Sequence, residues 1–315
     1  MLNRSHVIPK NGQLAIAPSD DGLAIADLQP GADHPSLKLC EFAPWEGDTS
    51  REDVMTAQSA ELKLKNRLCA SVLPATEYSI LSIEAPNVPD DEIQSAIRWQ
   101  IRDMIDFDAD EAVVEIFPAP QGNGVQQKRR LYVVVTRAQT IKALVDLVTH
   151  ANTKLDIIDI PELALRNIAA KLSEDDAGLA MVHLSSERGM VLISRQKQLY
   201  FARTMDIGIN TLNKVAPSVG SLALADNDAF DRIVLEIQRS LDYYDRYFSQ
   251  PPIAGVVFAP LPEPIPGLFE YVQASLGIAV RELDIAEVVD VEQTIDRSKL
   301  AQCVVAIGAA LRERH

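Results

Sequence analysis

The stretch "AMVHLSSERGMVLIS", residues 180–194, decides the fold. An apolar run, 180–184, meets a polar turn, 185–189, and a second apolar run, 190–193, follows at once. Two apolar runs joined by a short polar turn are typical of a β-hairpin. A turn that grips phosphate normally has several glycines or an acid that holds Mg²⁺, whereas this one has a single glycine, preceded by His183. The sequence therefore predicts a hairpin and raises the question of whether it binds a nucleotide.

A similar hairpin is predicted near the N-terminus. The segment "QLAIAPSDDGLAIADL", residues 13–28, reads as a strand, a tight polar turn and a second strand. Further strands and helices alternate after both hairpins, which implies a mixed α/β fold with helices covering the sheets. Two such halves predict two lobes separated by a cleft, and clefts of this kind commonly bind ligands.

The chain divides into three predicted units. Three strands, a helix that starts with a Ser-x-x-Asp pattern at Ser50, and a strand form the front of a ribonuclease-H-like subdomain. A strand-helix-strand-strand-helix module interrupts it. We expect residues 1–75 and 155–176 to form the first lobe, 76–154 an inserted α+β subdomain, and 177–315 the second lobe.

Composition excludes several classes of protein. The 315 residues are 47% hydrophobic and 24% charged, as in ordinary globular proteins. A net charge of −15 without a basic stripe argues against nucleic-acid binding. No apolar run is long enough to span a membrane, and no signal peptide is recognisable. The three cysteines form no CxxC pair, so a reducing compartment is favoured over a disulfide framework or a zinc site, and we expect a cytoplasmic protein.

Several segments resemble the PilM-like branch of the actin-fold superfamily, relatives of the cell-division protein FtsA. The likeness is most specific in "EIQRSLDYYDRYF" (236–248), and "VPDDEIQSAIRWQIRDMIDF" (88–107) resembles the helix of the family's inserted subdomain. "IPGLFEYVQASLGIAV" (265–280) and "CVVAIGAAL" (303–311) resemble its closing elements. The resemblance implies a two-lobed actin-like fold and a role in type IV pilus assembly, of the MSHA type, on the cytoplasmic face of the inner membrane. It also implies a PilN-like partner.

In that family three loops hold ATP, and all three depart from the pattern here. The first reads Ala17-Pro18-Ser19-Asp20-Asp21-Gly22, where the proline lacks a backbone donor and a carboxylate near phosphate is repelled by about 4 kcal/mol. The second has His183 and Ser185 where the family has an acid and a glycine, and a histidine does not replace the acid beside Mg²⁺-bound water. The third, residues 259–264, contains three prolines instead of glycines.

We therefore expect a vestigial cleft, with no cofactor, no metal ion and no catalytic residue. ATP and Mg²⁺ belong only to the alternative in which the protein still cycles between nucleotide states. The helix predicted over 230–248 carries an apolar stripe that indicates core packing: Phe230, Ile233, Val234, Ile237, Leu241, Tyr244 and Phe248. By the resemblance, this helix borders the cleft, although its charged residues equally fit a surface ion-pair ladder. The residues assigned to the vestigial cleft are Ser19, Asp20, Gly22, His183, Ser185, Gly189, Glu236 and Arg239.

A partner site is predicted on the inserted subdomain. Asp90 is predicted to be the cap or a first-turn acid of the helix that follows it. In that helix the residues at helical spacing form one apolar face: Ile93, Ile97, Ile101, Met104 and Ile105. Trp99 lies opposite that face, flanked by Arg98 and Arg102, which is the composition of an interface anchor. A neighbouring subdomain of the same chain covering Trp99 is the equal alternative.

The function that combines these observations is a non-catalytic scaffold that recruits the cytoplasmic tail of an inner-membrane pilus protein. We expect it to be cytoplasmic and held at the membrane only through that partner, with a homodimer left open. A sugar- or acetate-kinase relative would need the phosphate-loop glycines and a catalytic acid. The cytoplasmic region of a GspL-like type II secretion protein is a further alternative, since a chain cut before that protein's membrane span would look the same.

Overall fold

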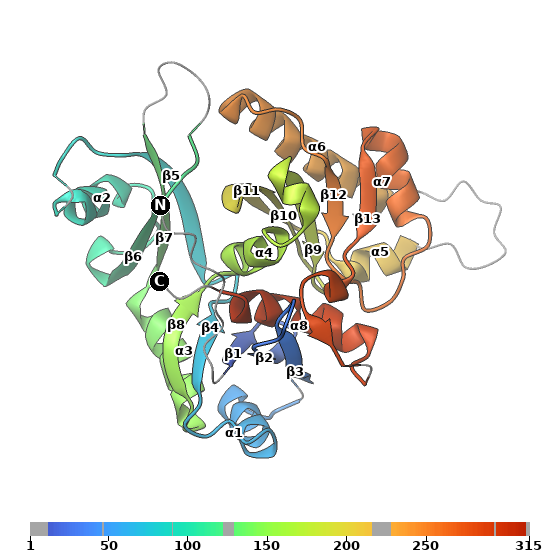
Figure 1. The fold of residues 1–315 in the computed structure, drawn as a ribbon. Coiled ribbons are helices and arrows are strands. Elements are labelled where there is room, and N and C mark those ends of the chain that lie inside the picture. The colour runs from blue at the N-terminus through green and yellow to red at the C-terminus, as the bar shows by residue number, and fades with distance from the viewer. Residues whose placement is uncertain are drawn as a thin grey trace.

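The computed structural model describes residues 12–45, 47–89, 91–121, 129–215, 228–292 and 294–312, and it arranges them as three β-sheets with flanking helices (Figure 1). Within these residues the first sheet has six strands in the order β14-β3-β2-β1-β4-β8. Its strands are β1 (Gln13–Pro18), β2 (Gly22–Gln29), β3 (Ser36–Pro44), β4 (Leu68–Val72), β8 (Lys154–Asp159) and β14 (Asp290–Val291).

The described part of the second lobe forms a five-stranded sheet in the order β11-β10-β9-β12-β13. Its strands are β9 (Leu179–Leu184), β10 (Gly189–Arg195), β11 (Gln198–Met205), β12 (Gly255–Phe258) and β13 (Ala279–Glu282). Each of these two sheets starts with an antiparallel hairpin and then adds a parallel strand beside the hairpin's first strand, β4 beside β1 and β12 beside β9. The two lobes therefore repeat one topology, which confirms the duplicated hairpin starts predicted from sequence.

The inserted sheet, as far as the structure describes it, has three antiparallel strands in the order β5-β7-β6. They are β5 (Tyr78–Glu84), β6 (Ala112–Pro118) and β7 (Arg130–Arg137). The Tyr132 hydroxyl on β7 donates a hydrogen bond to the Tyr200 carbonyl on β11, and the Tyr78 hydroxyl donates to the Glu162 carboxylate. The inserted sheet is thus fastened both to the second lobe and to the first helix after β8.

Helices cover the sheets on both sides. The α-helices are α1 (Arg51–Glu61), α2 (Ile93–Ile101), α3 (Ala138–His150), α4 (Pro161–Ala169), α5 (Ile209–Val215), α6 (Asp228–Phe248), α7 (Leu268–Leu276) and α8 (Arg297–Ala310). Short 3-10 helices are η1 (Ala109–Glu111), η2 (Ser173–Asp176) and η3 (Ile285–Glu287). None of the helices that the structure describes is long and apolar enough to cross a membrane.

Local sequence signals place several of these helices. Ser50 caps α1 by accepting a hydrogen bond from the Asp53 amide, as the Ser-x-x-Asp pattern predicts. The predicted stripe of α6 is buried at Phe230, Ile233 and Ile237 and continues through Tyr244 and Phe248. Apolar side chains at helical spacing lose water together when a helix packs on a sheet, so this face forms much of the second lobe's core.

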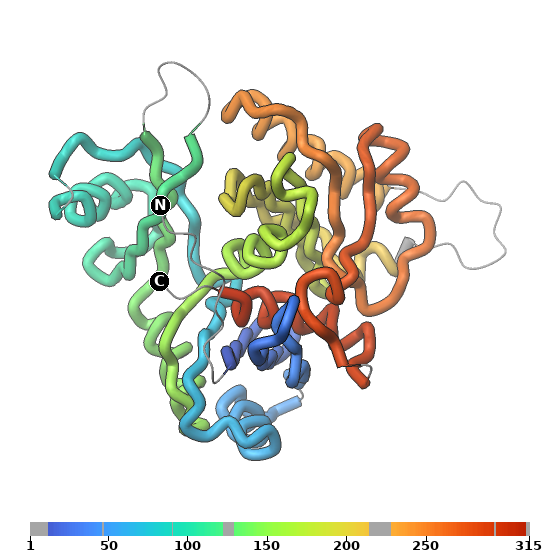
Figure 2. Tube along the Cα trace, viewed as in Figure 1, coloured from blue at the N-terminus to red at the C-terminus, as the bar shows by residue number. Residues whose placement is uncertain are grey.

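The packing of the last helix differs from the division predicted from sequence. α8 was assigned to the second lobe with residues 177–315, but it packs on β1, β2 and β3 of the first sheet, and Figure 2 shows it in red over the blue strands. β14 likewise pairs with β3 of the first sheet. α4, assigned to the first lobe, contacts α8 and also packs on β10 and β11 of the second. One apolar cluster therefore runs through both lobes and fixes the cleft between them.

α3 also crosses a predicted boundary. It was assigned to the inserted subdomain, yet its buried Leu144, Leu147 and Val148 pack into the cluster that covers the outer face of the first sheet. All three cysteines are buried free thiols. Cys40 and Cys303 are neighbours in the fold, where a hydrogen bond with Cys40 and burial raise the pKa of the Cys303 thiol well above its usual range.

Candidate functional site

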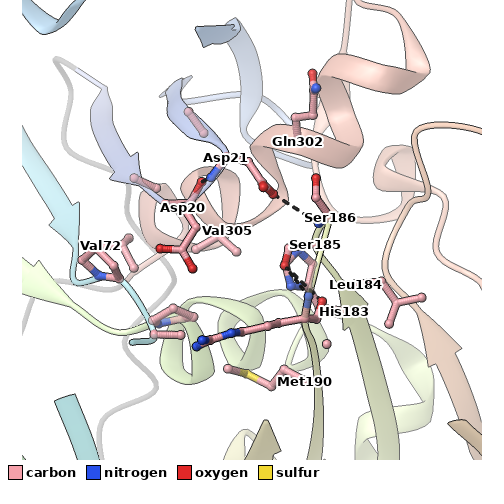
Figure 3. A pocket seen from close by; sticks show the side chains of 18 of the residues that line it. Asp20, Asp21, Val72, His183, Leu184, Ser185, Ser186, Met190, Gln302 and Val305 are labelled. Atoms are coloured by element: carbon pink, nitrogen blue, oxygen red, sulfur yellow. Dashed lines mark hydrogen bonds between the residues drawn. The ribbon is translucent and has the colours of Figure 1, made fainter. Parts of the chain in front are cut away.

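A cavity of about 400 Å³ lies between the two lobes where the first and second hairpins turn. Figure 3 shows Asp20 and Asp21 on one side and His183, Ser185 and Ser186 on the other. Apolar side chains make up most of its remaining wall: Phe42, Pro44, Val72, Pro74, Met190, Ile209 and Val305. The cavity therefore has two polar turns at its mouth and an apolar body.

The turn between β1 and β2 satisfies its own backbone donors. The Ser19 hydroxyl oxygen accepts hydrogen bonds from the amides of Asp21 and Gly22, each at 3.2 Å. The Ser19 amide donates to the Gly22 carbonyl at 2.9 Å, and the Trp45 indole Nε1 donates to the Ser19 carbonyl at 2.7 Å. A phosphate cradle needs free amides that point at the ligand, so the two amides bound by Ser19 are not available for one.

The turn between β9 and β10 is built in the same way. The Ser185 amide donates to the Arg188 carbonyl at 2.8 Å, and the Ser185 hydroxyl oxygen accepts from the Arg188 amide at 3.3 Å. Gly208 lies against the back of this turn, and a Cβ at that position would stand 2.4 Å from the Ser186 carbonyl oxygen. The turn is therefore held from inside by a serine and from behind by a close backbone approach.

The two turns bond to each other across the cleft. The Asp21 carboxylate oxygen Oδ2 accepts a hydrogen bond from the Ser186 amide at 3.2 Å (Figure 3). A backbone amide in a hairpin turn is the group that would meet a phosphate oxygen, and here a carboxylate of the same chain takes that place. We call this contact the lobe latch. It joins the lobes directly and puts negative charge where a phosphate would have to enter.

The third predicted loop, residues 259–264, is also hydrogen-bonded within the chain. The Leu261 amide donates to a Glu282 carboxylate oxygen at 2.8 Å, and the Arg297 guanidinium binds both Glu282 carboxylate oxygens, at 2.6 and 2.7 Å. Arg297 also donates to the Leu261 carbonyl at 2.9 Å, while the Leu261 side chain is buried. A single guanidinium nitrogen, Nη2, reaches both Glu282 oxygens while Nε binds the Leu261 carbonyl, and these charge-assisted contacts tie the loop to α8 and β13.

His183 faces the cavity as a neutral group at pH 7. It is partly buried at the end of β9, and removal from water lowers its pKa from 6.5 to about 4. The nearby Asp21 carboxylate acts in the opposite direction but is outweighed. A neutral imidazole is a poor substitute for the acid that the resemblance expects here. Among the residues that the structure describes, no group of three or more His, Cys, Asp or Glu side chains is placed to hold a metal ion.

The cavity gathers five of the eight residues assigned to the vestigial cleft: Ser19, Asp20, His183, Ser185 and Gly189. Gly22 does not line it and instead backs onto β3, where an added Cβ would stand 2.5 Å from the Ala43 carbonyl oxygen. Glu236 and Arg239 are also elsewhere: they line a separate hollow of about 310 Å³. There Glu236 pairs with Arg239 at 2.7 Å and Arg203 at 3.5 Å, so the surface ion-pair alternative describes them better than the cleft-facing one.

The predicted partner residues separate in the structure. Trp99 is 80% exposed, so no described part of the chain covers it. Arg98 donates hydrogen bonds to the carbonyls of Ala112 at 2.8 Å and Ala109 at 3.4 Å, so it connects α2 to the backbone around η1 within the inserted subdomain. Arg102 is exposed. Met104, predicted on the apolar face, is 51% exposed because α2 ends at Ile101; Asp90, the predicted cap, lies outside the described residues.

Sequence reasoning missed the residues that close the cleft. Asp21 was recognised as an acid near the phosphate position, but its partner Ser186 was not, and neither was the pairing of Glu282 with Arg297. The spacing along the chain gives no signal for either contact. The hydrogen bonds inside each turn were predictable, because serines stand at equivalent turn positions and serine side chains commonly bond the backbone of their own turn.

Comparisons with solved structures establish the fold. The chain is similar to the PilM component of a PilM–PilN type IV pilus biogenesis complex, with a TM-score of 0.73 and 18% identity over 96% of this chain and 98% of that one. It is also similar to a Bacteroides thetaiotaomicron protein with an actin-like ATPase fold (TM-score 0.50, 10% identity, 93% and 96% covered). The ethanolamine utilization protein EutJ of Carboxydothermus hydrogenoformans gives a TM-score of 0.50 with 11% identity, covering 98% of this chain and 91% of that chain.

This chain has the actin-like ATPase fold. The similarity extends over nearly the whole chain and so includes the inserted subdomain as well as both lobes. At 18% identity it establishes architecture, not activity. By sequence, no protein-family model and no curated protein matches the chain.

Proposed function

We propose that this protein is a non-catalytic scaffold of a type IV pilus assembly machine that recruits the cytoplasmic tail of a PilN-like inner-membrane protein. The observation that carries the proposal is the similarity to PilM over 96% of the chain, in a structure solved as a PilM–PilN complex. The finer assignment, an MSHA-type machine with a protein similar to MshI, rests on the sequence resemblance alone. On this proposal the protein acts in the cytoplasm and is held at the inner membrane by its partner.

The non-catalytic part of the proposal is supported by the state of the cleft. Each of the three loops that would contact a nucleotide is already bonded within the chain: by Ser19, by the lobe latch between Asp21 and Ser186, and by Glu282. A nucleotide would have to displace these contacts and overcome the repulsion between Asp21 and its phosphates. We expect ATP·Mg²⁺ to bind no better than about 1 mM, which corresponds to only about −4 kcal/mol.

Isothermal titration with ATP·Mg²⁺ and a thermal-shift series test this expectation. A ligand at 100 times its dissociation constant stabilises a fold by about 2.7 kcal/mol, which gives a clear rise in melting temperature. We expect no saturable shift and no ATP hydrolysis. Micromolar binding would contradict the scaffold and support the alternative, a protein that cycles between nucleotide states. The observation that favours this alternative is the cavity of about 400 Å³ between the lobes.

The recruiting part is tested with the partner. The full chain is used to capture the cytoplasmic tail of a PilN-like inner-membrane protein, and a scrambled tail serves as the control. We expect capture of the native tail with or without ATP, because the scaffold does not depend on a nucleotide state. Failure to capture the tail under both conditions would contradict the proposal.

A further inference from the structure

The C-terminal end of α2 carries an unusual pair of exposed apolar side chains. Among the described residues, four large hydrophobic side chains are strongly exposed: Leu68, Trp99, Met104 and Leu235. Trp99, at 80%, is the most exposed of them, and Met104, at 51%, follows it within six residues. Figure 1 shows α2 at the outer edge of the inserted subdomain, on the side away from the second lobe. Tryptophan dominates the energetics of many protein interfaces, and methionine adapts to varied partners.

The surroundings of this pair are acidic. From residue 91 to 111 the chain has seven acidic residues, namely Asp91, Glu92, Asp103, Asp106, Asp108, Asp110 and Glu111, against two arginines. One of these arginines, Arg98, is held by two backbone carbonyls of its own subdomain. The exposed Trp99 and Met104 therefore stand in a field that is negative overall. We call these two side chains, with Asp103 and Asp106, the acidic anchor patch.

Two of the acids in the patch have no helix-capping role. Asp103 and Asp106 follow the C-terminus of α2 at Ile101, where the helix dipole is negative and a basic residue would be stabilising. Asp106 is 88% exposed and reaches Arg137 only at 3.6 Å. Asp108, by contrast, caps η1, so it has a structural reason to be acidic. Acidic residues at a helix C-terminus, where the dipole favours basic ones, indicate that their charge serves an interaction outside the helix.

We propose that the segment that docks on the acidic anchor patch is basic and amphipathic, with apolar side chains on Trp99 and Met104 and lysines or arginines toward Asp103 and Asp106. This inference rests on the proposed function, because it specifies the chemistry of the recruited tail. Cytoplasmic segments next to a membrane span are enriched in lysine and arginine, so an inner-membrane protein supplies such a segment. The anionic membrane surface itself is repelled by the same carboxylates.

Two designed peptides test the charge requirement. One is a short amphipathic helix of leucine and lysine, and the other has glutamate at every lysine position. The full chain carries two tryptophans, so Trp45→Phe leaves Trp99 as the fluorescent reporter. We expect a blue shift of Trp99 emission with the lysine peptide only. The binding weakens as NaCl rises from about 0.05 M to about 0.5 M, because salt screens exposed charges.

Variants of the patch test the location. With the lysine peptide, detected through a label on the peptide, Trp99→Ala weakens binding about 30-fold and the pair Asp103→Asn/Asp106→Asn about fivefold. The matched control neutralises two exposed acids elsewhere, Glu61→Gln and Glu263→Gln, and changes binding less than about twofold. Trp99→Phe retains part of the affinity, and thermal melts verify that each variant is folded.

Several outcomes overturn the inference. Equal binding of the glutamate peptide, or unchanged binding of the lysine peptide to Trp99→Ala, removes its basis. Trp99-dependent binding to vesicles of phosphatidylglycerol and phosphatidylethanolamine makes the site a membrane contact instead. Failure of the proposed function has a different signature: the lysine peptide binds as described but the PilN-like tail is not captured. If the tail is captured equally by wild type and both patch variants, the scaffold stands and this inference fails.

Discussion

The two hairpin turns that face each other across the cleft are built alike but have opposite roles. Each begins with a serine whose amide donates to the carbonyl three residues later, Ser19 to Gly22 and Ser185 to Arg188, and whose hydroxyl binds an amide of the same turn. The first turn then presents the Asp21 carboxylate, and the second presents the Ser186 backbone amide, which donates to it. One turn supplies the anion and the other the anion-binding donor.

This difference shows that two copies of one turn can carry groups of opposite character. If both turns presented amides, the cleft would attract a phosphate; a carboxylate on one of them lets the chain satisfy the other. The Asp21–Ser186 hydrogen bond thereby joins the two turns across the cleft. The end of α2 is the opposite case, since its Trp99 has no covering group in the described structure. On the proposed function, we therefore expect partner binding outside the cleft.

The largest predicted effect is on the support behind the second turn. Gly208→Ala would place a Cβ 2.4 Å from the Ser186 carbonyl oxygen and 2.6 Å from the Arg188 amide nitrogen, all backbone atoms that a rotamer change cannot move. We expect a loss of about 3 kcal/mol of unfolding free energy, measured by urea titration.

Gly267→Ala is the matched control for that change. Gly267 has a φ of +79° but no neighbouring atom within 4 Å of an added Cβ, so only backbone strain, about 1 kcal/mol, is expected. If Gly208→Ala costs no more than Gly267→Ala, the second turn is not held rigidly from behind. The comparison between the two turns would then lose its structural basis.

The second predicted effect is a pH dependence of the unfolding free energy that comes from His183, which lies just before the second turn. The first turn has no histidine at the equivalent place. The folded-state pKa of His183, about 4, lies below the unfolded value of 6.5, so the unfolded chain binds more protons between these values. Stability is therefore lost as pH falls from 6.5 toward 4, by about 2 kcal/mol at pH 5. Burial raises the pKa of Glu162, which contributes with the opposite sign, so the effect of His183 needs isolating.

The variant His183→Gln isolates it. Urea titrations of wild type and variant at pH 8 and pH 5 give the difference in unfolding free energy at each pH. We expect the wild type to lose about 2 kcal/mol more than the variant between the two conditions. Equal losses would mean that His183 is as hydrated in the folded chain as in the unfolded one.

Sequence predicted the parts of this molecule that depend on near neighbours. The two hairpins, the Ser50 cap and the buried face of α6 follow from periodicity and turn residues within a few positions. The exposure of Trp99 was left open between two alternatives, and packing decided it. Met104 was assigned to the apolar face because nothing in the sequence marks the end of α2 at Ile101. An apolar residue three positions after Ile101 fits helical spacing, so it was counted as part of the helix.

Contacts between distant segments could not be predicted. Asp21 and Ser186 are 165 residues apart, and α8 reaches the first sheet only because β14 leads the chain back there. A one-dimensional pattern records which side chains are apolar but not which of two sheets they cover. The same limit placed Glu236 and Arg239 in the cleft, when α6 turns that face toward β11 and Arg203.

The smallest predicted effect is removal of the lobe latch itself. Asp21→Ala deletes a carboxylate–amide hydrogen bond of 3.2 Å that is partly exposed, so we expect a loss of about 1 kcal/mol of unfolding free energy. Asp20→Ala, at the exposed neighbouring acid, is the control and changes stability by less than about 0.5 kcal/mol. The Asp21 carboxylate also raises the pKa of His183, so NMR titration of the imidazole has to show a still lower pKa in Asp21→Ala. An unchanged imidazole titration together with unchanged stability would mean that the two turns do not act on each other. The cleft would then be open to a phosphate on the side of Ser186, and ATP titration of Asp21→Ala measures that directly.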